Sequence, residues 1–282
     1  MPSFAISSSP VKSSSKPAGD RLRRITGHHN ARLKELRQAF RRSELTSDGH
    51  CAVEGVKLVE EALRSGQRFG GIFFRESDRP LAEKLLPQIN AHVETLLLPN
   101  SLFESIVPSD APQGVAALVK LRPHSLDEII ERALAGPIVV AVGLQDPGNL
   151  GTILRSSEAF AAAGVFLAEG TVSPYNSKVL RGSAGSIFRL PVVQISSNKL
   201  IPALRKGGVR LLATSSHKGT ALPDAAWKFP LAIFIGNEGA GLPRDLLHQM
   251  DEILVIPQAA PVESLNAGVA GSILLYEIAR KK

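Results

Sequence analysis

Polar side chains and glycines occur together in three stretches of the chain, each directly after an apolar run that is typical of a buried strand. In the last stretch, Ser264 and Asn266 lie where a loop becomes a helix, so hydroxyl, amide and free backbone N–H groups converge there. In the middle stretch, Glu238 lies within Gly236-Asn-Glu-Gly-Ala-Gly241, whose glycines let a ligand approach the backbone closely. Open α/β sheets bind ligands at the carboxyl ends of their strands, so the middle stretch indicates a binding site. The last stretch, taken alone, is equally typical of a capped helix that closes a domain.

The first of the three stretches places Asn149 and Arg155 in one helix, with Asn149 as the expected N-cap. Arg155 lies among Ile153, Leu154 and Phe160, so its charge needs a polar or acidic partner if the side chain is buried. Otherwise it is a surface arginine whose aliphatic part packs on the apolar neighbours while the guanidinium stays in water. The glycines of the middle stretch follow the order Gly-x-x-Gly-x-Gly, and Gly-Lys-Ser/Thr is absent. Neither a dinucleotide fingerprint nor a phosphate loop is therefore indicated.

A framework of alternating strands and helices must position these residues, and the periodicity predicts one from residue 137 onward. Its apolar runs are short and continuous, which favours a mostly parallel sheet with helices on both faces. The expected strands are 138–144, 165–167, 192–194, 210–214, 231–235 and 253–256, and the expected helices are 149–163, 199–206, 244–250 and 265–280, the last capped by Ser264.

A smaller α/β unit is predicted over residues 25–120, followed by a linker at 121–136 that contains a helix at 127–134. Residues 1–24 are rich in Ser, Pro and Lys, and we expect a disordered basic tail there; organelle transit peptides have a similar composition. The other expected elements are a basic helix at 30–42, strands at 51–53, 71–74, 93–98 and 114–119, and helices at 56–65, 81–91 and 102–107.

The net charge of +7 is concentrated at the start of the chain, where the first 45 residues hold ten Lys or Arg against three Asp or Glu. A basic arm on a neutral body indicates contact with a polyanion such as RNA, although a solubilising tail has the same composition. Arg32 and Arg37 lie on the basic helix. Lys178, Arg181 and Arg189 lie in a Ser- and Gly-rich segment, which is either a flexible surface loop or a second contact with phosphates.

The composition also sets aside several kinds of site. The single cysteine, Cys51, excludes an intrachain disulfide and leaves no cysteine cluster for zinc, so we expect no metal. His28, His29 and His50 lack matching ligands and are expected on the surface. No apolar run approaches the roughly 20 residues that span a bilayer, and no secretory signal is present. We expect no membrane partner and a cytoplasmic location, with organelle import left open.

The three stretches, in this order, resemble the motifs of the SpoU (TrmH-like) family of RNA 2′-O-ribose methyltransferases in the SPOUT superfamily. The similar segments are Asn149-Leu-Gly-x-Ile-Leu-Arg155, Ile235-Gly-Asn-Glu-Gly-x-Gly-Leu242 and Ile256-Pro-x(6)-Ser-Leu-Asn-x-x-Val-Ala270. Upstream, Val53-Glu-Gly-Val-Lys-Leu-Val-Glu-Glu-Ala62 and Gln113-Gly-Val-Ala-Ala117 resemble the substrate-binding domain that many members carry. The resemblance extends from about residue 25 to the end and implies a C-terminal trefoil knot.

The resemblance implies that S-adenosylmethionine binds in the knot. Backbone groups of the last two motifs would hold it, at Gly236, Ile256, Leu265 and Asn266, with Thr214 nearby at the end of the preceding strand. The chain departs from the family in the last motif, where Ala267 and Gly268 replace the Val and Ser of many members. Gly268 is expected to loosen the helix by up to about 1 kcal/mol relative to Ala and to alter the packing of the dimer.

The resemblance also implies catalytic roles. Arg155 matches the family's catalytic arginine, oriented by Asn149, and in many members this arginine comes from the partner subunit, so a homodimer is implied. A guanidinium has a pKa above about 12 and normally cannot accept a proton. Arg155 is therefore either the base, as often proposed, or an orienting group that acts with or without a phosphate. Glu238 and Ser264 would shape the site, and Asn266 would cap its loop.

Two functions from different classes remain. The first is an RNA 2′-O-methyltransferase acting on structured RNA, with ribosomal RNA favoured and transfer RNA left open. The alternative is a non-catalytic RNA-binding or ribosome-assembly factor with the same fold. The retained motif residues favour the enzyme, and the missing dinucleotide fingerprint excludes a nucleotide-dependent oxidoreductase. Aromatic residues make up only 5% of the chain, so recognition by RNA shape is favoured over base stacking.

Overall fold

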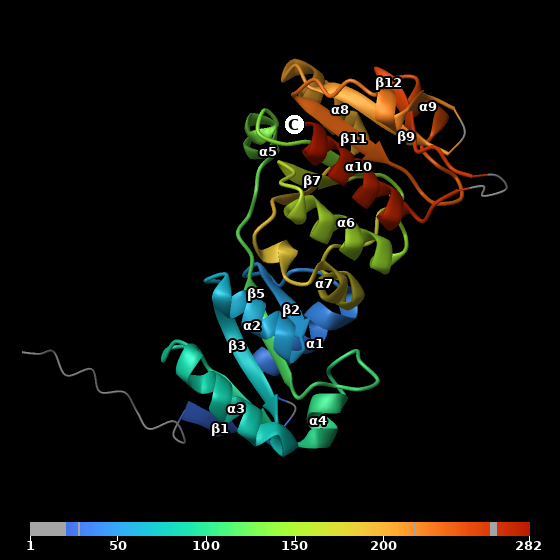
Figure 1. The fold of residues 1–282 in the computed structure, drawn as a ribbon. Coiled ribbons are helices and arrows are strands. Elements are labelled where there is room, and N and C mark those ends of the chain that lie inside the picture. Colours follow the sequence, from blue (N-terminus) through green and yellow to red (C-terminus); the bar gives the residue numbers. More distant parts are fainter. Residues whose placement is uncertain (1–20, 28, 217, 260–263) are drawn as a thin grey trace, which may run out of the picture.

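The computed structural model describes residues 21–282 except 28, 217 and 260–263. Two α/β domains lie end to end and meet around α7 (Ser177–Ser183), which belongs to the second domain and packs against β2 (His50–Glu54) of the first (Figure 1). Within the described ranges, no helix is long and apolar enough to cross a membrane.

The expected tail ends earlier than the sequence predicts. Residues 1–20 lie outside the described residues, but β1 (Leu22–Arg24) pairs in parallel with β4 (Thr95–Leu98). Arg21 anchors the start of this strand, because its Nη2 donates a hydrogen bond to the carbonyl oxygen of Ile89 at 2.8 Å. The prediction of a disordered tail is therefore wrong for its last residues. A sheet edge supplies them with backbone partners that composition does not reveal.

The first domain is a mixed sheet with helices on both faces, as the alternation predicts. Its other elements are α1 (Ala31–Arg42), α2 (Val56–Arg64), β3 (Arg68–Arg75), α3 (Arg79–Leu85), α4 (Asn100–Glu104) and β5 (Val115–Lys120), with 3₁₀ turns at Glu76–Asp78 and Leu86–Gln88. The strand order is β1-β4-β3-β5-β2. β5 runs antiparallel to both of its neighbours, β3 and β2, and the other neighbouring pairs are parallel. Successive side chains face opposite sides, so Phe73 joins a buried cluster with α1 and α4, whereas Phe74 joins one with α2 and α3.

The second domain follows the linker helix α5 (Leu126–Arg132) and alternates between strands and helices. Its strands are β6 (Ile138–Ala141), β7 (Gly164–Leu167), β8 (Val192–Gln194), β9 (Arg210–Ser215), β10 (Thr220–Ala221), β11 (Leu231–Ile235) and β12 (Glu252–Val255). Its further helices are α6 (Pro147–Ala159), α8 (Ser197–Lys206), α9 (Arg244–Leu247) and α10 (Ala267–Lys281), with 3₁₀ turns at Ser186–Phe188 and Leu222–Asp224.

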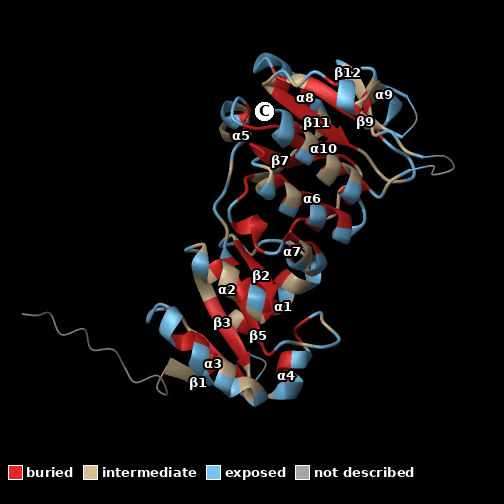
Figure 2. Ribbon diagram, in the orientation of Figure 1, coloured by how far each residue is buried: buried red, intermediate tan, exposed pale blue. Residues whose placement is uncertain are grey.

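The sheet of the second domain has the order β10-β12-β9-β11-β6-β7-β8, and every neighbouring pair is parallel. Val139 and Ala141 share a buried cluster with α6 and α10, whereas Ile138 and Val140 share one with α5 and α8. Figure 2 shows the central strands buried and the outer helix surfaces exposed. The predicted parallel sheet with helices on both faces is confirmed, and the two-residue β10 is an addition to it.

Two helices begin differently from the prediction. Asp146 caps α6, because its Oδ1 accepts the N–H of Asn149 at 2.8 Å, and Asn149 lies inside the first turn. Asn266 caps α10, because its Oδ1 accepts the N–H of Val269 at 3.2 Å. The expected caps Asn149 and Ser264 are therefore wrong. In each case a second residue with a suitable side chain lies within three positions, so the sequence alone does not distinguish the two.

A helix, α7, forms in the segment that could have been a flexible loop. Asn176 caps it, since its Oδ1 accepts the N–H of Lys178 at 2.9 Å. α7 also touches the backbone of α6, because a Cβ added at Gly151 would lie only 2.8 Å from the Cα of Gly182. The flexible-loop alternative is wrong for this part of the segment, and α6 and α7 are held as one unit.

Candidate functional site

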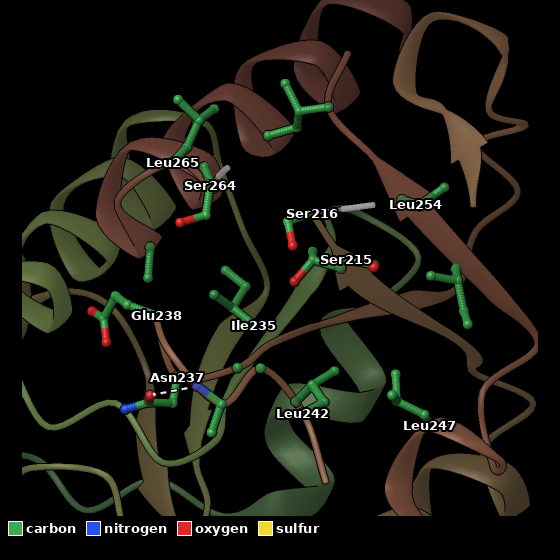
Figure 3. Close-up of a pocket in the computed structure, with 18 of the residues that line it drawn as sticks. Ser215, Ser216, Ile235, Asn237, Glu238, Leu242, Leu247, Leu254, Ser264 and Leu265 are labelled. Atoms are coloured by element: carbon green, nitrogen blue, oxygen red, sulfur yellow. Dashed lines mark hydrogen bonds between the residues drawn. The ribbon is translucent and has the colours of Figure 1, made fainter. Parts of the chain in front are cut away.

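A cavity of about 700 Å³ opens at the carboxyl ends of β9, β11 and β12, which are neighbours in the sheet. Figure 3 shows Glu238, Ser264 and Leu265 along one side and Ser216 and Leu254 across from them. This volume suits a ligand the size of a modified nucleoside. Several residues predicted from the motifs line the cavity: Thr214, Gly236, Glu238, Ile256, Ser264 and Leu265.

The glycine turn after β11 is fixed by Asn237, which the sequence analysis did not single out. Its backbone exchanges two hydrogen bonds with Gly241, at 2.9 and 3.2 Å. Its side-chain Oδ1 accepts the N–H groups of Gly239 and Ala240, and its Nδ2 donates to the carbonyl oxygen of Gly143 at 3.1 Å. An asparagine between glycines often forms such local bonds, so the sequence did contain a signal for this role.

The three motifs meet around Gly268 on α10. The Nδ2 of Asn149, from the first motif, donates a hydrogen bond to Oε1 of Glu238, from the second. A Cβ added at Gly268 would lie 3.2 Å from Oδ1 of Asn149, 3.2 Å from Oδ1 of Asn266 and 3.1 Å from Cβ of Thr152. Gly268, a departure from the family, therefore lies where α6 and α10 pack closely, and glycine leaves room for both amide side chains.

Arg155 is not brought into the cavity of its own chain. It is exposed on α6, and no hydrogen bond or ion pair connects it to the part of the chain that the structure describes. Asn149, expected to orient Arg155, contacts Glu238 instead. A face of α10 beside α6 exposes Val269 and Tyr276, and the Tyr276 ring meets that of Phe160 edge-on, with centroids 5.8 Å apart.

The five predicted RNA contacts are in different surroundings. Lys178 is exposed at the start of α7, and Arg32 pairs with Glu35 at 2.9 Å on α1, the helix that also carries Arg37. Arg181 and Arg189 are engaged within the protein at the junction of the two domains, where acidic side chains of the first domain face them. All five lie at least partly at the surface, but Arg181 and Arg189 are paired with acidic side chains of the other domain.

Groups set aside by the sequence analysis have structural roles. Cys51 is buried in β2, as expected for a small strand residue, and burial raises the pKa of its thiol to about 12. His50 is buried rather than exposed, because its ring packs over Gly70, and burial lowers its pKa. His28 lies outside the described residues. Among the residues placed in the structure, no group of three or more His, Cys, Asp or Glu could hold a metal ion.

The cavity residues fit the cofactor implied by the motifs. Gly236 lines the cavity, and its lack of a Cβ lets the turn close tightly, since a Cβ at this position would lie 2.5 Å from the carbonyl carbon of Gly241. Ile235 and Leu254 supply apolar walls. Gln258 also lines the cavity, and its buried Oε1 has no hydrogen-bond partner among the described residues, so it can accept from an amine. No sequence signal pointed to Gln258, because it lies in a loop without periodicity.

Comparisons with known proteins match both domains. Residues 136–276 match the SpoU rRNA Methylase family, and residues 30–117 match the MRM3-like substrate binding domain. The chain is similar to the 23S rRNA (guanosine(2553)-2′-O)-methyltransferase RlmP of Bacillus subtilis (strain 168). The two are 29% identical over 257 residues, which cover 91% of this chain and 99% of the relative.

Two further proteins are similar over nearly the whole chain. An uncharacterized tRNA/rRNA methyltransferase of Synechocystis sp. is 34% identical over 273 residues, covering 92% of this chain and 94% of the relative. The crystal structure of an AdoMet-bound rRNA methyltransferase from Sinorhizobium meliloti superimposes with a TM-score of 0.79 at 27% identity. That match covers 93% of this chain and 98% of the other.

Proposed function

The chain belongs to the SpoU rRNA Methylase family, and from that membership we propose that it transfers a methyl group from S-adenosylmethionine to a ribose 2′-hydroxyl of ribosomal RNA. The observation that carries this proposal is the meeting of three distant segments beside one cavity, which the second and third motifs line. Asn149 bonds to Glu238, and both Asn149 and Asn266 pack against Gly268. Asn149, Glu238 and Asn266 are residues that the family motifs specify, and the chain retains them close together.

The cofactor, when bound, supplies an activated methyl group. Backbone groups at Gly236, Ile256 and Leu265 would hold it, and the Oε1 of Gln258 is available to accept a hydrogen bond from one of its amines. Thr214 lines the cavity, but its hydroxyl hydrogen is used within the sheet, since its Oγ1 donates to the carbonyl oxygen of Phe234 at 3.1 Å. Apolar walls exclude water from the transfer, which requires a dry and aligned site.

The chain's own polar groups orient the RNA. Glu238 is held by Asn149, and Ser264 presents a hydroxyl on the same side of the cavity (Figure 3). Arg155 binds and aligns the RNA at the reacting ribose, with or without help from a phosphate. The proton of the ribose hydroxyl passes to an RNA phosphate oxygen or to water rather than to Arg155, because a guanidinium normally cannot accept a proton.

The active enzyme is a homodimer in this proposal. Arg155 is exposed and does not line its own cavity, so a single chain lacks one member of the catalytic set. Arg155 of one chain would serve the cavity of the other. The exposed apolar side chains of Val269 and Tyr276, 46% and 54% accessible, support burial of this face of α10 against a second copy.

The proposal includes a knotted path of the C-terminal segment. β12 lies between β9 and β10 in the sheet, although only four residues, 216–219, separate those two strands in the sequence. β12 comes after β9 and β10 in the sequence but lies between them in the sheet. This arrangement supports a path in which the chain passes through an earlier loop. Such a path would also explain how the second and third motifs enclose one cavity, with the first motif packed against them.

The test is transfer of labelled methyl to unmodified ribosomal RNA and to transfer RNA, with wild-type protein and Arg155→Ala. We expect label in ribosomal RNA as 2′-O-methylribose, and at least a hundredfold less label with the variant. Cofactor binding, measured by calorimetry, should be the same for both proteins. Label in transfer RNA alone would overturn the substrate class. A wild-type protein that binds no cofactor and labels neither RNA would instead be a non-catalytic assembly factor.

A further inference from the structure

Arg189 lies between two carboxylates that belong to different domains. Its Nη2 donates to Oε2 of Glu158 on α6 at 3.0 Å, and its Nε donates to the other oxygen of the same carboxylate. Its Nη1 donates to Oε2 of Glu61 on α2 at 2.9 Å and to Oγ of Ser65 at 2.8 Å. One planar guanidinium therefore holds the helix that carries the first motif and a helix of the substrate-binding domain at the same time.

A second arginine of the C-terminal domain, Arg181, also contacts an acidic side chain of the first domain. Nη1 of Arg181, on α7, lies 3.6 Å from Oε2 of Glu54 at the end of β2 and donates to Oγ of Ser109 at 3.2 Å. The side chain of Glu54 is only 3% exposed. A buried carboxylate is costly without a cation nearby, and Arg181 offsets part of that cost by charge, since Oε2 of Glu54 has no hydrogen-bond partner among the described residues. Gln67 of the first domain adds a hydrogen bond from Nε2 to the carbonyl oxygen of Phe188, at 3.0 Å.

These contacts end on the helix that carries the catalytic arginine. Glu158 follows Arg155 by three positions on α6, so the two side chains leave the same side of the helix about one turn apart. α7 cannot move independently of α6, because Gly151 and Gly182 bring the two backbones into contact. Any rotation of the substrate-binding domain would therefore have to break the contacts of Arg189 or displace α6.

We propose that Arg189, supported by Arg181, is a positioning residue that fixes the angle at which RNA on the substrate-binding domain meets the helix carrying Arg155. This inference rests on the proposed function, since the domain is taken to hold RNA. It also changes the role expected for these two arginines, from binding phosphate to joining the domains.

The charges around Arg189 argue against direct binding of phosphate. Its guanidinium is shared by two carboxylates, so an approaching phosphate would meet a group whose charge is already more than balanced. The hydrogen bonds from Arg189 hold the pKa of Glu158 below its ordinary value, so this carboxylate stays ionised at neutral pH. Lys178 differs: it is exposed at the start of α7 without an ion-pair partner in the described part of the chain, as expected of a phosphate contact.

The kinetic test compares Glu61→Gln, Arg189→Gln and the double variant on ribosomal RNA, with Lys178→Gln as the matched phosphate control. Each single variant should lower kcat about ten- to a hundredfold, through misplacement of the ribose, and the double variant should lower it no further. The dependence of log affinity on log salt should keep its slope in all three. Lys178→Gln should lower that slope by about one and raise KM.

A second test does not depend on catalysis. Spin labels on exposed positions of α3 and α8, in protein diluted with unlabelled chains, report the distribution of distances between the two domains. Arg189→Gln and Glu61→Gln should broaden this distribution while calorimetry shows unchanged cofactor binding. A distance distribution that does not broaden would overturn the inference. So would a drop of one unit in the slope of log affinity against log salt for Arg189→Gln, if Glu61→Gln kept full activity. If wild type labels no RNA, the proposed function fails, and the distance measurement still decides the role of Arg189.

Discussion

Asn149 and Glu238, 89 positions apart in the chain, are joined by a hydrogen bond from amide to carboxylate that connects the first motif to the second. Asn149 is only 7% exposed, so water cannot replace the hydrogen bond if its side-chain amide loses its partner. We expect Asn149→Asp to lower the free energy of unfolding by about 1–3 kcal/mol at neutral pH, because two carboxylates then face each other. Urea denaturation measures the loss.

The matched control for this pair is Asn149→Asp combined with Glu238→Gln, which reverses the direction of the hydrogen bond. The double variant should recover most of the lost stability, since an amide again faces a carboxylate. Equal stability of the single and double variants would show that the contact does not stabilise the fold.

Gly268 is predicted to be intolerant of the serine that many family members carry. A Cβ at this position would lie 3.1–3.2 Å from three neighbouring atoms, so α6 and α10 must separate or an amide must move. We expect Gly268→Ser to cost about 1–3 kcal/mol of stability and to weaken cofactor binding. Gly27→Ser is the matched control and should change neither, because a Cβ added at Gly27 meets no atom within 4 Å. A Gly268→Ser protein as stable as wild type would refute close packing here.

The shared site can be tested by mixing two inactive variants. Arg155→Ala leaves the cavity intact, and Ser216→Trp fills the cavity with an indole while leaving Arg155 in place. If Arg155 acts in the cavity of the partner, each mixed dimer has one complete site, and a mixture of equal amounts should recover about a quarter of wild-type activity. No recovery after exchange of subunits, shown by native mass spectrometry, would mean that Arg155 acts within its own chain.

The stability contributed by Glu158 should depend on pH. The hydrogen bonds from Arg189 lower its pKa from the ordinary value of 4.5, so the folded state binds the proton less readily than the unfolded state. Its contribution is therefore fully present above pH 4.5 and is lost as the pH falls through the lower folded pKa. The difference in unfolding free energy between wild type and Glu158→Gln should shrink between pH 6 and pH 3. A constant difference would contradict the pairing.

The sequence predicted best what repeats along the chain. β11 was predicted residue for residue, because a strand buried on both faces is a continuous apolar run. The parallel direction of the strands followed from the alternation of strands and helices. The glycine turn and the three motif segments were located because they are defined by residue types that are close together in the sequence. β10, with two residues, has no period to detect.

Contacts between distant residues could not be predicted. Asp146 and Asn149 both make good caps, and only the path of the chain decides which one is used. Arg181 and Arg189 have the same composition around them as a phosphate-binding segment. Their acidic partners, Glu54 and Glu61, come from a domain more than 120 positions away in the chain, and no local pattern specifies that meeting.

The insertion of β12 between β9 and β10 also bears on when the enzyme becomes active during its synthesis. Until β12 forms, a growing chain has an unpaired edge on β9, and β10 has no neighbour. The walls of the cavity extend from Thr214 to Leu274, so a ribosome-bound chain shorter than this has nowhere to hold the methyl donor. Donor binding is thus a late event in biogenesis, and a nascent chain that has exposed only its substrate-binding domain can meet RNA before it is able to modify it.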